Sequence, residues 1–186
     1  MKNLYYLQLI KEKDKTINKM IIENLKLKRE LEYYKKNNYI DNLTKLYNRR
    51  VIDNLHQYHS VVFADIDYFK SINDKYGHDF GDRVLIEVSK VLKKVADSKD
   101  ITCRWGGEEF VILIKKNKEN LPIELAERIK IGLKSLREMF GFPVTMSIGI
   151  SYIKNDDIKE AIIEADDAMY QSKNQGRNKI SIYKIQ

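Results

Sequence analysis

Two short acidic segments carry residues that could do chemistry. Glu108 and Glu109 follow a Gly-Gly pair at 106–107, a tight-turn signal between two apolar runs, so a hairpin turn is expected to present both carboxylates. Asp65 and Asp67 stand at the C-terminal end of an apolar run, where strands of an α/β sheet carry ligand-binding groups. Hard divalent cations take oxygen ligands and share them with phosphates. The two segments therefore predict a metal site for phosphoryl chemistry, against the simpler alternative of a solvated acidic turn.

Residues 106–110, Gly-Gly-Glu-Glu-Phe, resemble the signature of the GGDEF family of diguanylate cyclases in its common GGEEF form. Four further motifs accompany it in the family's order and spacing, at 41–50, 65–74, 77–82 and 173–178. The resemblance covers residues 41–186, which we expect to form the catalytic domain. It implies an α/β (α+β) fold in which helices cover a mixed central β-sheet, the palm-like fold of nucleotidyl cyclases.

The resemblance also implies a magnesium site. In the family two Mg²⁺ ions per active site are held at positions that match Asp65, the backbone carbonyl of Ile66, and Glu108, and Mn²⁺ is an alternative ion. A metal that bridges phosphate oxygens lowers the pKa of an attacking hydroxyl. Glu109 is a second candidate for metal binding or proton removal, and the sequence leaves open which glutamate is the base. Lys70 is placed to offset charge on the transferring phosphoryl group.

The implied substrate is GTP. Phe69 and Lys70 belong to an expected turn between strand and helix whose backbone N–H groups would cradle the β- and γ-phosphates. Lys173 and Arg177 match the family's triphosphate-binding cations. Their alternative interpretation is a basic helix end that complements the helix dipole.

Asn73 and Asp82 match the family's guanine-reading residues. A carboxylate accepts hydrogen bonds from N1–H and the 2-amino group of guanine, donors that adenine lacks, so Asp82 should select GTP. His78 either contacts the base or ribose or is structural. Asp74 is interpreted as a helix cap.

Residues 97–100 occupy the place of an Arg-x-x-Asp inhibitory motif that binds cyclic di-GMP in many members of the family. Asp100 keeps the motif's aspartate, but Asp97 replaces its arginine. An acid therefore stands where a planar cation should bind a phosphate. We expect the inhibitory site to be degenerate.

Charge and composition limit the partners. Lys and Arg outnumber Asp and Glu by 34 to 27, and residues 1–40 hold ten of these bases and five of the acids. Because the lysines are scattered, a solvated helix face is favoured over a surface for nucleic acid or membrane. No run reaches the roughly 18 apolar residues that span a bilayer. The single Cys103 is expected to be a buried strand residue. Together these features predict a soluble, cytoplasmic protein.

Apolar periodicity predicts the elements that position the site. Helices are expected at 43–58, 74–95, 122–140 and 157–172, and strands at 61–67, 101–103, 110–114, 144–153 and 179–185. Pro122 suits the first turn of its helix. The order β-α-β-β-α-β, followed by a further helix and strand, predicts a mixed sheet covered by helices.

Residues 1–40 contain neither Gly nor Pro and predict one long helix, a dimerisation segment separate from the catalytic domain. Seven of its eleven heptad core positions are apolar or aromatic, which predicts a coiled coil, and the polar residue at position 24 favours one register. The alternative is a lone amphipathic helix that docks on its own domain. The a positions are Asn3, Ile10, Ile17, Asn24, Leu31 and Asn38, and the d positions are Tyr6, Lys13, Met20, Leu27 and Tyr34.

The sequence thus predicts a diguanylate cyclase in which two facing domains of a homodimer join two GTP molecules into cyclic di-GMP and release two pyrophosphates. The rival hypothesis is a degenerate domain that binds GTP or cyclic di-GMP as a receptor. The intact Asp65, Lys70 and Glu108 argue against a pure receptor, which has no need of metal-binding acids. A relative that makes an adenine-containing dinucleotide is disfavoured by Asp82.

Overall fold

The structure is a computed structural model that describes residues 2–37 and 39–184 and divides into two compact units, Met1–Tyr39 and Ile40–Gln186. The first unit is the long helix α1 (Lys2–Asn37), as the absence of Gly and Pro predicts. No helix in the described residues is long and apolar enough to cross a membrane.

The heptad seam of α1 is exposed. The apolar side chains of Ile10, Ile17, Met20, Leu27 and Leu31 are each between 52% and 61% accessible. Three further positions of the predicted pattern, Asn3, Tyr34 and Asn38, lie outside the part of the chain whose side chains the structure describes. An exposed apolar row of this kind is a surface suited to a second helix.

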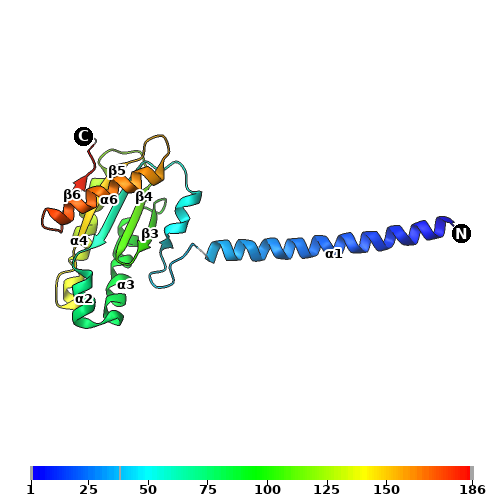
Figure 1. Ribbon diagram of the computed structural model, residues 1–186, viewed down its shortest axis with the longest axis horizontal. Helices are drawn as coiled ribbons and strands as arrows, with labels where there is room; N and C mark the ends of the chain where they lie inside the picture. Colours follow the sequence, from blue (N-terminus) through cyan, green and yellow to red (C-terminus); the bar gives the residue numbers. More distant parts are fainter. Residues whose placement is uncertain (1, 38, 185–186) are drawn as a thin grey trace. The chain divides into compact units, whose positions relative to one another are not determined.

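The second unit contains a six-stranded mixed sheet with β2 near its centre (Figure 1). The strand order is β1-β3-β4-β2-β5-β6. Strand β2 runs antiparallel to β4 and β5, and β3 runs antiparallel to β4, whereas β1–β3 and β5–β6 are parallel pairs. The predicted mixed sheet is therefore confirmed. The strands are β1 (Tyr47–Asn48), β2 (Ser60–Ile66), β3 (Ile101–Gly106), β4 (Glu109–Ile114), β5 (Met146–Tyr152) and β6 (Ile180–Ile182).

Helices cover both faces of this sheet. Helix α6 packs on β2 and β5, while α3 and α4 contribute to the main apolar core on the other face (Figure 1). The helical elements are η1 (Arg49–Asn54), α2 (Phe69–Tyr76), α3 (His78–Val95), α4 (Leu121–Leu133), α5 (Leu136–Phe140) and α6 (Ile158–Asn174).

The two faces follow from the alternation of side chains along the strands. On β2, the side chains of Val62, Ala64 and Ile66 enter the core with α3 and α4. The residues that alternate with them, Val61, Phe63 and Asp65, lie on the face that α6 covers.

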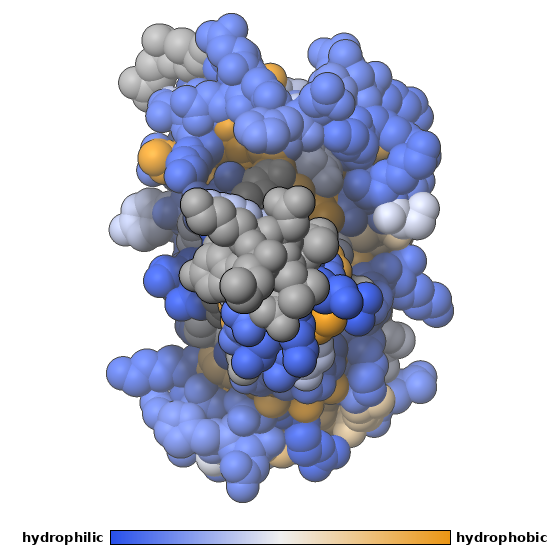
Figure 2. Space-filling view, turned by 90° about the vertical axis from the view of Figure 1, so that its right-hand side faces the viewer, coloured by the Kyte–Doolittle hydropathy of each residue, from blue (hydrophilic) through white to orange (hydrophobic). Residues whose placement is uncertain are grey.

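Cys103 on β3 is also fully buried, and burial raises the pKa of its thiol to about 12, which agrees with the expected unreactive cysteine. Figure 2 shows a mainly hydrophilic surface, in keeping with a chain of which 33% is charged.

The predicted helix at 43–58 was wrong. The segment instead forms the short strand β1 and the 3-10 helix η1. Polar side chains cause the difference, because the Asp41 carboxylate accepts hydrogen bonds from the N–H and hydroxyl of Thr44, and the Asn48 side chain accepts one from the N–H of Arg50. Such local bonds compete with a regular helix.

The other helix boundaries moved by less. The region 74–95 is two helices that meet at Gly77, whose φ of 87° ends α2. Asp74 lies inside α2, so its interpretation as a cap was also wrong. The helix expected over 122–140 divides into α4 and α5 at Lys134 and Ser135. The last strand ends at Ile182, and residue 185 of its predicted range lies outside the described residues.

The close approach of α6 to β5 depends on Gly149. A Cβ atom at this position would lie 2.0 Å from the carbonyl oxygen of Ala165 and 2.2 Å from the backbone nitrogen of Met169. The helix backbone therefore rests directly on the strand. Near the end of α6, the Ser172 hydroxyl donates a hydrogen bond to the carbonyl oxygen of Ile148 at 2.8 Å. These contacts fix the residue that follows, Lys173, beside the sheet.

Candidate active site

Asp65 lies near the end of β2 between two other strands. It is in register with Glu109 on β4 and with Ser147 on β5. Residues directly opposite each other in an antiparallel pair place their side chains on the same face, with Cβ atoms about 5 Å apart. The two acidic segments of the sequence therefore meet at one end of the sheet.

Lys173 brings a positive charge to this end of the sheet. Its Nζ lies 2.8 Å from Oδ2 of Asp65, and the Asp65 side chain is only 6% exposed. A buried carboxylate requires such a partner, since an unpaired charge out of water is strongly unfavourable. The ion pair thus connects Asp65, in the motif at 65–74, with Lys173, in the motif at 173–178, which lies 108 positions later in the chain.

Burial raises the pKa of Asp65, and the hydrogen bond and charge of Lys173 oppose that rise. The pKa of Glu109 is raised first by burial and then by the charge of Asp65. Asp166 on α6 adds to this rise, and the pKa of Asp166 is itself raised by burial. One lysine therefore faces several acids, and a further cation would relieve their mutual repulsion.

Asp166 was missed by the sequence analysis. It lies two helical turns before Lys173, so the 3.6-residue period places both residues on one face of α6. Once Lys173 had been identified as a candidate site residue, the spacing of two helical turns could have identified Asp166 as well. The site thus receives groups from β2, β4 and α6.

The arrangement has the oxygen ligands that a hard cation takes. In the described residues no three His, Cys, Asp or Glu side chains form a cluster that could hold a metal ion. Asp65, Glu108 and backbone carbonyls near them could supply part of a coordination shell, and phosphate oxygens and water would supply the rest. Lys173 already places one positive charge against the Asp65 carboxylate. The donor set fits a cation that binds together with a phosphorylated substrate.

The hairpin turn that carries Glu108 is fixed by a hydrogen bond from β2 and by contacts of Arg104. The N–H of Ile66 donates to the carbonyl oxygen of Glu108 at 3.3 Å. Arg104 donates from Nε to the carbonyl oxygen of Gly107 at 2.9 Å, and its Nη1 lies 3.3 Å from Oδ1 of Asp41. Asp41 belongs to the motif at 41–50, and Arg104 lies two residues before the signature at 106–110. The structure shows that these two side chains fix the position of the acidic turn.

Asp67 connects three segments around the site. Its buried carboxylate accepts hydrogen bonds from the Thr145 hydroxyl at 2.7 Å, the Ser147 hydroxyl at 2.6 Å and the N–H of Asn178 at 2.9 Å. Its own N–H donates to the carbonyl oxygen of Thr145 at 2.9 Å. The loop after β2 is thereby tied to the start of β5 and to the turn after α6. The sequence analysis gave Asp67 no separate role, because these donors lie about 80 and 111 positions away.

The loop after β2 turns sharply into α2. Tyr68 has a left-handed backbone with φ of 58°, and α2 begins at Phe69. The guanidinium carbon of Arg177 lies 4.7 Å from the centre of the Tyr68 ring, a cation–π contact. Phe69 is buried, so its backbone rather than its side chain is available to a ligand, and Lys70 is exposed in the first turn of α2.

The predicted guanine-reading residues lie on α2 and α3. Oδ1 of Asn73 is buried and has no hydrogen-bond partner in the described residues. It sits against Gly81, where a Cβ atom would lie 1.9 Å from it. Asp82 is next to Gly81 and exposed, and His78 is exposed at the start of α3. The buried Asn73 oxygen and the exposed Asp82 carboxylate are both hydrogen-bond acceptors, so they suit a ligand that carries hydrogen-bond donors.

The predicted inhibitory segment is occupied by contacts within the protein. Oδ2 of Asp97 lies 2.6 Å from Nζ of Lys116. The Asp100 carboxylate accepts hydrogen bonds from the N–H of Asp97 at 2.9 Å and the N–H of Lys115 at 3.1 Å. Both aspartates therefore stabilise their own turn.

Comparisons with known proteins agree on one family. The model described as diguanylate cyclase, GGDEF domain, matches residues 38–179. Diguanylate cyclase DgcM of Escherichia coli is 40% identical over 67% of this chain and 30% of its own length, and uncharacterized protein YtrP of Bacillus subtilis is 35% identical over 88% of this chain and 29% of its own. The chain thus spans about a third of the length of these curated relatives.

Solved structures show the same fold. The coiled coil and GGDEF domain of DgcB from Caulobacter crescentus, in complex with c-di-GMP, gives a TM-score of 0.76 at 26% identity, covering 91% of this chain and 98% of that one. The active GGEEF domain of a diguanylate cyclase from Vibrio cholerae gives 0.69 at 29% identity, covering 76% and 99%. The family resemblance seen in the sequence is confirmed: the chain belongs to the GGDEF-domain family of diguanylate cyclases.

Proposed function

We propose that two copies of this chain join two GTP molecules into cyclic di-GMP and release two pyrophosphates. The observation that carries the proposal is the buried Asp65, in register with Glu109 and paired with Lys173. This set of charges is suited to a triphosphate bound with a cation. The similarity to named diguanylate cyclases supports it, and a GTP-consuming reaction is consistent with a cytoplasmic location.

The triphosphate would lie over the loop that follows β2. Backbone N–H groups at the start of α2 point out of the helix and can bind phosphate oxygens. Arg177, held over the Tyr68 ring, and Lys70, exposed in the first turn of α2, would bind further oxygens. Lys173 would exchange its carboxylate partner Asp65 for a phosphate when the nucleotide arrives.

The proposed magnesium ligands are Asp65, the carbonyl of Ile66, and Glu108, for two ions per active site, with Mn²⁺ as an alternative. Bound there, the metal would offset phosphate charge and lower the pKa of the attacking hydroxyl. Glu109 is our candidate for the base, because its register with Asp65 places it beside the proposed metal ligands without being one of them. The 3′-oxygen of one GTP bonds to the α-phosphorus of the other as the bond from that phosphorus to pyrophosphate breaks.

Guanine would be read between α2 and α3. The unpartnered Oδ1 of Asn73 can accept one hydrogen bond, and the exposed Asp82 can accept the N1–H and 2-amino donors. A site built to pair with these donors rejects a base that lacks them. His78, exposed at the start of α3, could contact the same nucleotide.

Turnover needs two facing domains, since each domain holds one GTP. We propose that α1 pairs with α1 of a second copy through its exposed heptad seam, which raises the effective concentration of the partner domain. A parallel pair would let both catalytic domains leave the stalk at the same end.

The function is tested by incubation with GTP and Mg²⁺ and chromatography of the products. Wild-type protein should form cyclic di-GMP, and Glu108→Gln should reduce the rate by about 10²-fold or more because a metal ligand is lost. The circular dichroism spectrum should not change. Glu138→Gln on the exposed part of α5 is a matched control and should remain active. Absence of product from the wild type would refute the function, whereas near-normal activity of Glu108→Gln would refute only the metal assignment.

Base selection can be tested at Gly81 and Asp82. Gly81→Ala should push the Asn73 amide out of its place and raise the KM for GTP about tenfold, since one hydrogen bond to the base is lost. Asp82→Ser should also relax the rejection of ATP, while Asp79→Ser, another exposed aspartate on the same helix, should not. An unchanged ratio of GTP to ATP turnover in Asp82→Ser would contradict the assignment.

The coiled-coil proposal predicts different effects from two similar leucines on α1. Leu27 occupies a core heptad position and Leu25 does not, although both are just over half exposed. Leu27→Glu should weaken the dimer and make activity per protein fall on dilution, because a charge enters the seam. Leu25→Glu should behave as wild type in sedimentation and in activity. Equal behaviour of the two variants would count against a dimer through this seam.

Feedback inhibition through residues 97–100 should be weak. Asp97 repels a phosphate and is bound to Lys116, and Asp100 is engaged by two backbone N–H groups. Isothermal titration of the metal-free protein with cyclic di-GMP should therefore show no submicromolar site in this segment, and turnover should continue as product accumulates to micromolar levels. Submicromolar binding that disappears in Asp100→Ala would show that the site is functional despite Asp97.

A further inference from the structure

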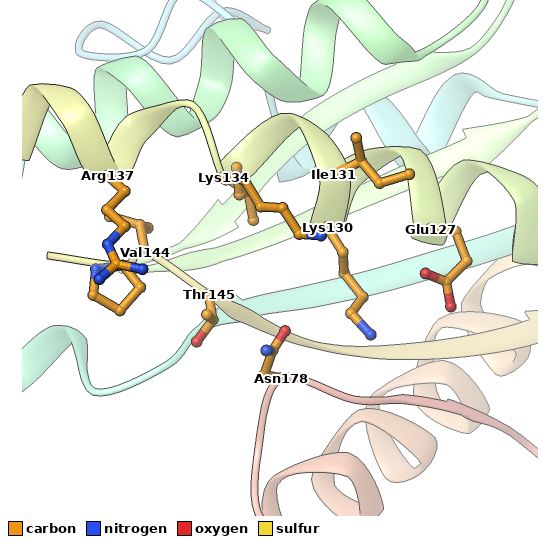
Figure 3. Close-up of a pocket in the computed structure, with 10 residues that line it drawn as sticks. Glu127, Lys130, Ile131, Lys134, Arg137, Val144, Thr145 and Asn178 are labelled. Atoms are coloured by element: carbon orange, nitrogen blue, oxygen red, sulfur yellow. The ribbon is translucent and has the colours of Figure 1, made fainter.

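A basic pocket of about 500 Å³ lies beside the turn after α6. The end of α4 and α5 form one wall, and the segment before β5 and the turn at Asn178 form the other (Figure 3). In this view the side chains of Lys130 and Asn178 reach into the pocket from opposite walls. The polar lining residues are Glu127, Lys130, Lys134, Arg137, Thr145 and Asn178.

We propose that this pocket binds a small phosphate-bearing anion, at a site separate from the proposed nucleotide site. Three of its lining residues, Lys130, Lys134 and Arg137, are cations, and only Glu127 is an acid. None of the three cations forms an ion pair with a carboxylate in the part of the chain that the structure describes. Like charges gathered around one concavity repel each other, and a bound anion removes that repulsion.

The helix dipole explains only part of this cluster. A basic residue in the last turn of α4 complements the partial negative charge there, and Lys130 occupies that turn. Lys134 is the C-cap residue of α4 and lies near the same partial charge, whereas Arg137 lies on the five-residue helix α5, and both line the same pocket. Two flexible ammonium groups and one planar guanidinium around a cavity match the several oxygens of a phosphate group.

The pocket shares a wall with the loop of the proposed nucleotide site, and the one carboxylate side chain among its lining residues is Glu127. Thr145 and Asn178 line it, and both donate hydrogen bonds to Asp67. These bonds satisfy the Asp67 oxygens and place Thr145 and Asn178 between that carboxylate and the pocket. The side-chain amide of Asn178 can add a donor from this wall. The volume lies within the range of small-molecule sites.

Inorganic pyrophosphate is the probe for the experiment, and binding does not require the proposed turnover. The full-length ¹⁵N-labelled protein is titrated with pyrophosphate in the presence of a metal chelator, and amide shifts are followed by NMR. Saturable shifts are expected at 130–137 and at Val144 and Thr145. Amides at 68–73 report separately on the nucleotide site.

The double variant Lys134→Gln/Arg137→Gln should weaken the binding measured at 130–137 about 10²-fold, since two charged hydrogen bonds are lost. Shifts at 68–73 should keep their wild-type affinity. The control Lys90→Gln/Lys118→Gln removes the same charge from exposed sites elsewhere and should bind as wild type. Absence of saturable shifts at 130–137, or an affinity there that the double variant does not change, would overturn the proposal. Loss of cyclase activity alone would bear on the proposed function and not on this site.

Discussion

The ion pair between Asp65 and Lys173 is the interaction on which the rest of the site depends. It can form only because the backbone of α6 rests on β5 at Gly149, which brings the end of the helix within reach of β2. A buried carboxylate without this partner would be strongly unfavourable. The close packing of α6 on Gly149 thus determines whether Lys173, near the end of the same helix, can form its ion pair with Asp65.

Excess negative charge is the second organising feature of the site. Several acids converge from β2, β4 and α6 on one lysine, and burial disfavours their charged forms. A folded protein that keeps such a cluster is less stable without a cation than with one. This loss of stability is consistent with a site that is completed by its ligands. The amide oxygen of Asn73, which has no hydrogen-bond partner in the described residues, is consistent with the same conclusion.

Much of this architecture could be predicted from the sequence, because strands such as β2 and β4 are continuous apolar runs and the family motifs lie at their ends. The helix expected over 43–58 did not form, since hydrogen bonds accepted by the side chains of Asp41 and Asn48 favour other local structure. The structural role of Asp67, which was predicted only as an acid at the strand end, and the contribution of Asp166 were not predicted, for a different reason. Their importance comes from partners far away in the chain, and no local period reports such contacts.

The three hydrogen bonds to Asp67 have a consequence for the thermodynamics of ligand binding. They order the loop after β2 and the turn that carries Arg177 through contacts that involve no ligand. The conformational entropy of these segments is therefore lost when the chain folds and not when a nucleotide arrives. A ligand that meets a preordered loop loses less of its gross interaction energy to the ordering of the protein. Binding at this loop should consequently show a smaller unfavourable entropy than binding to a loop that orders around its ligand.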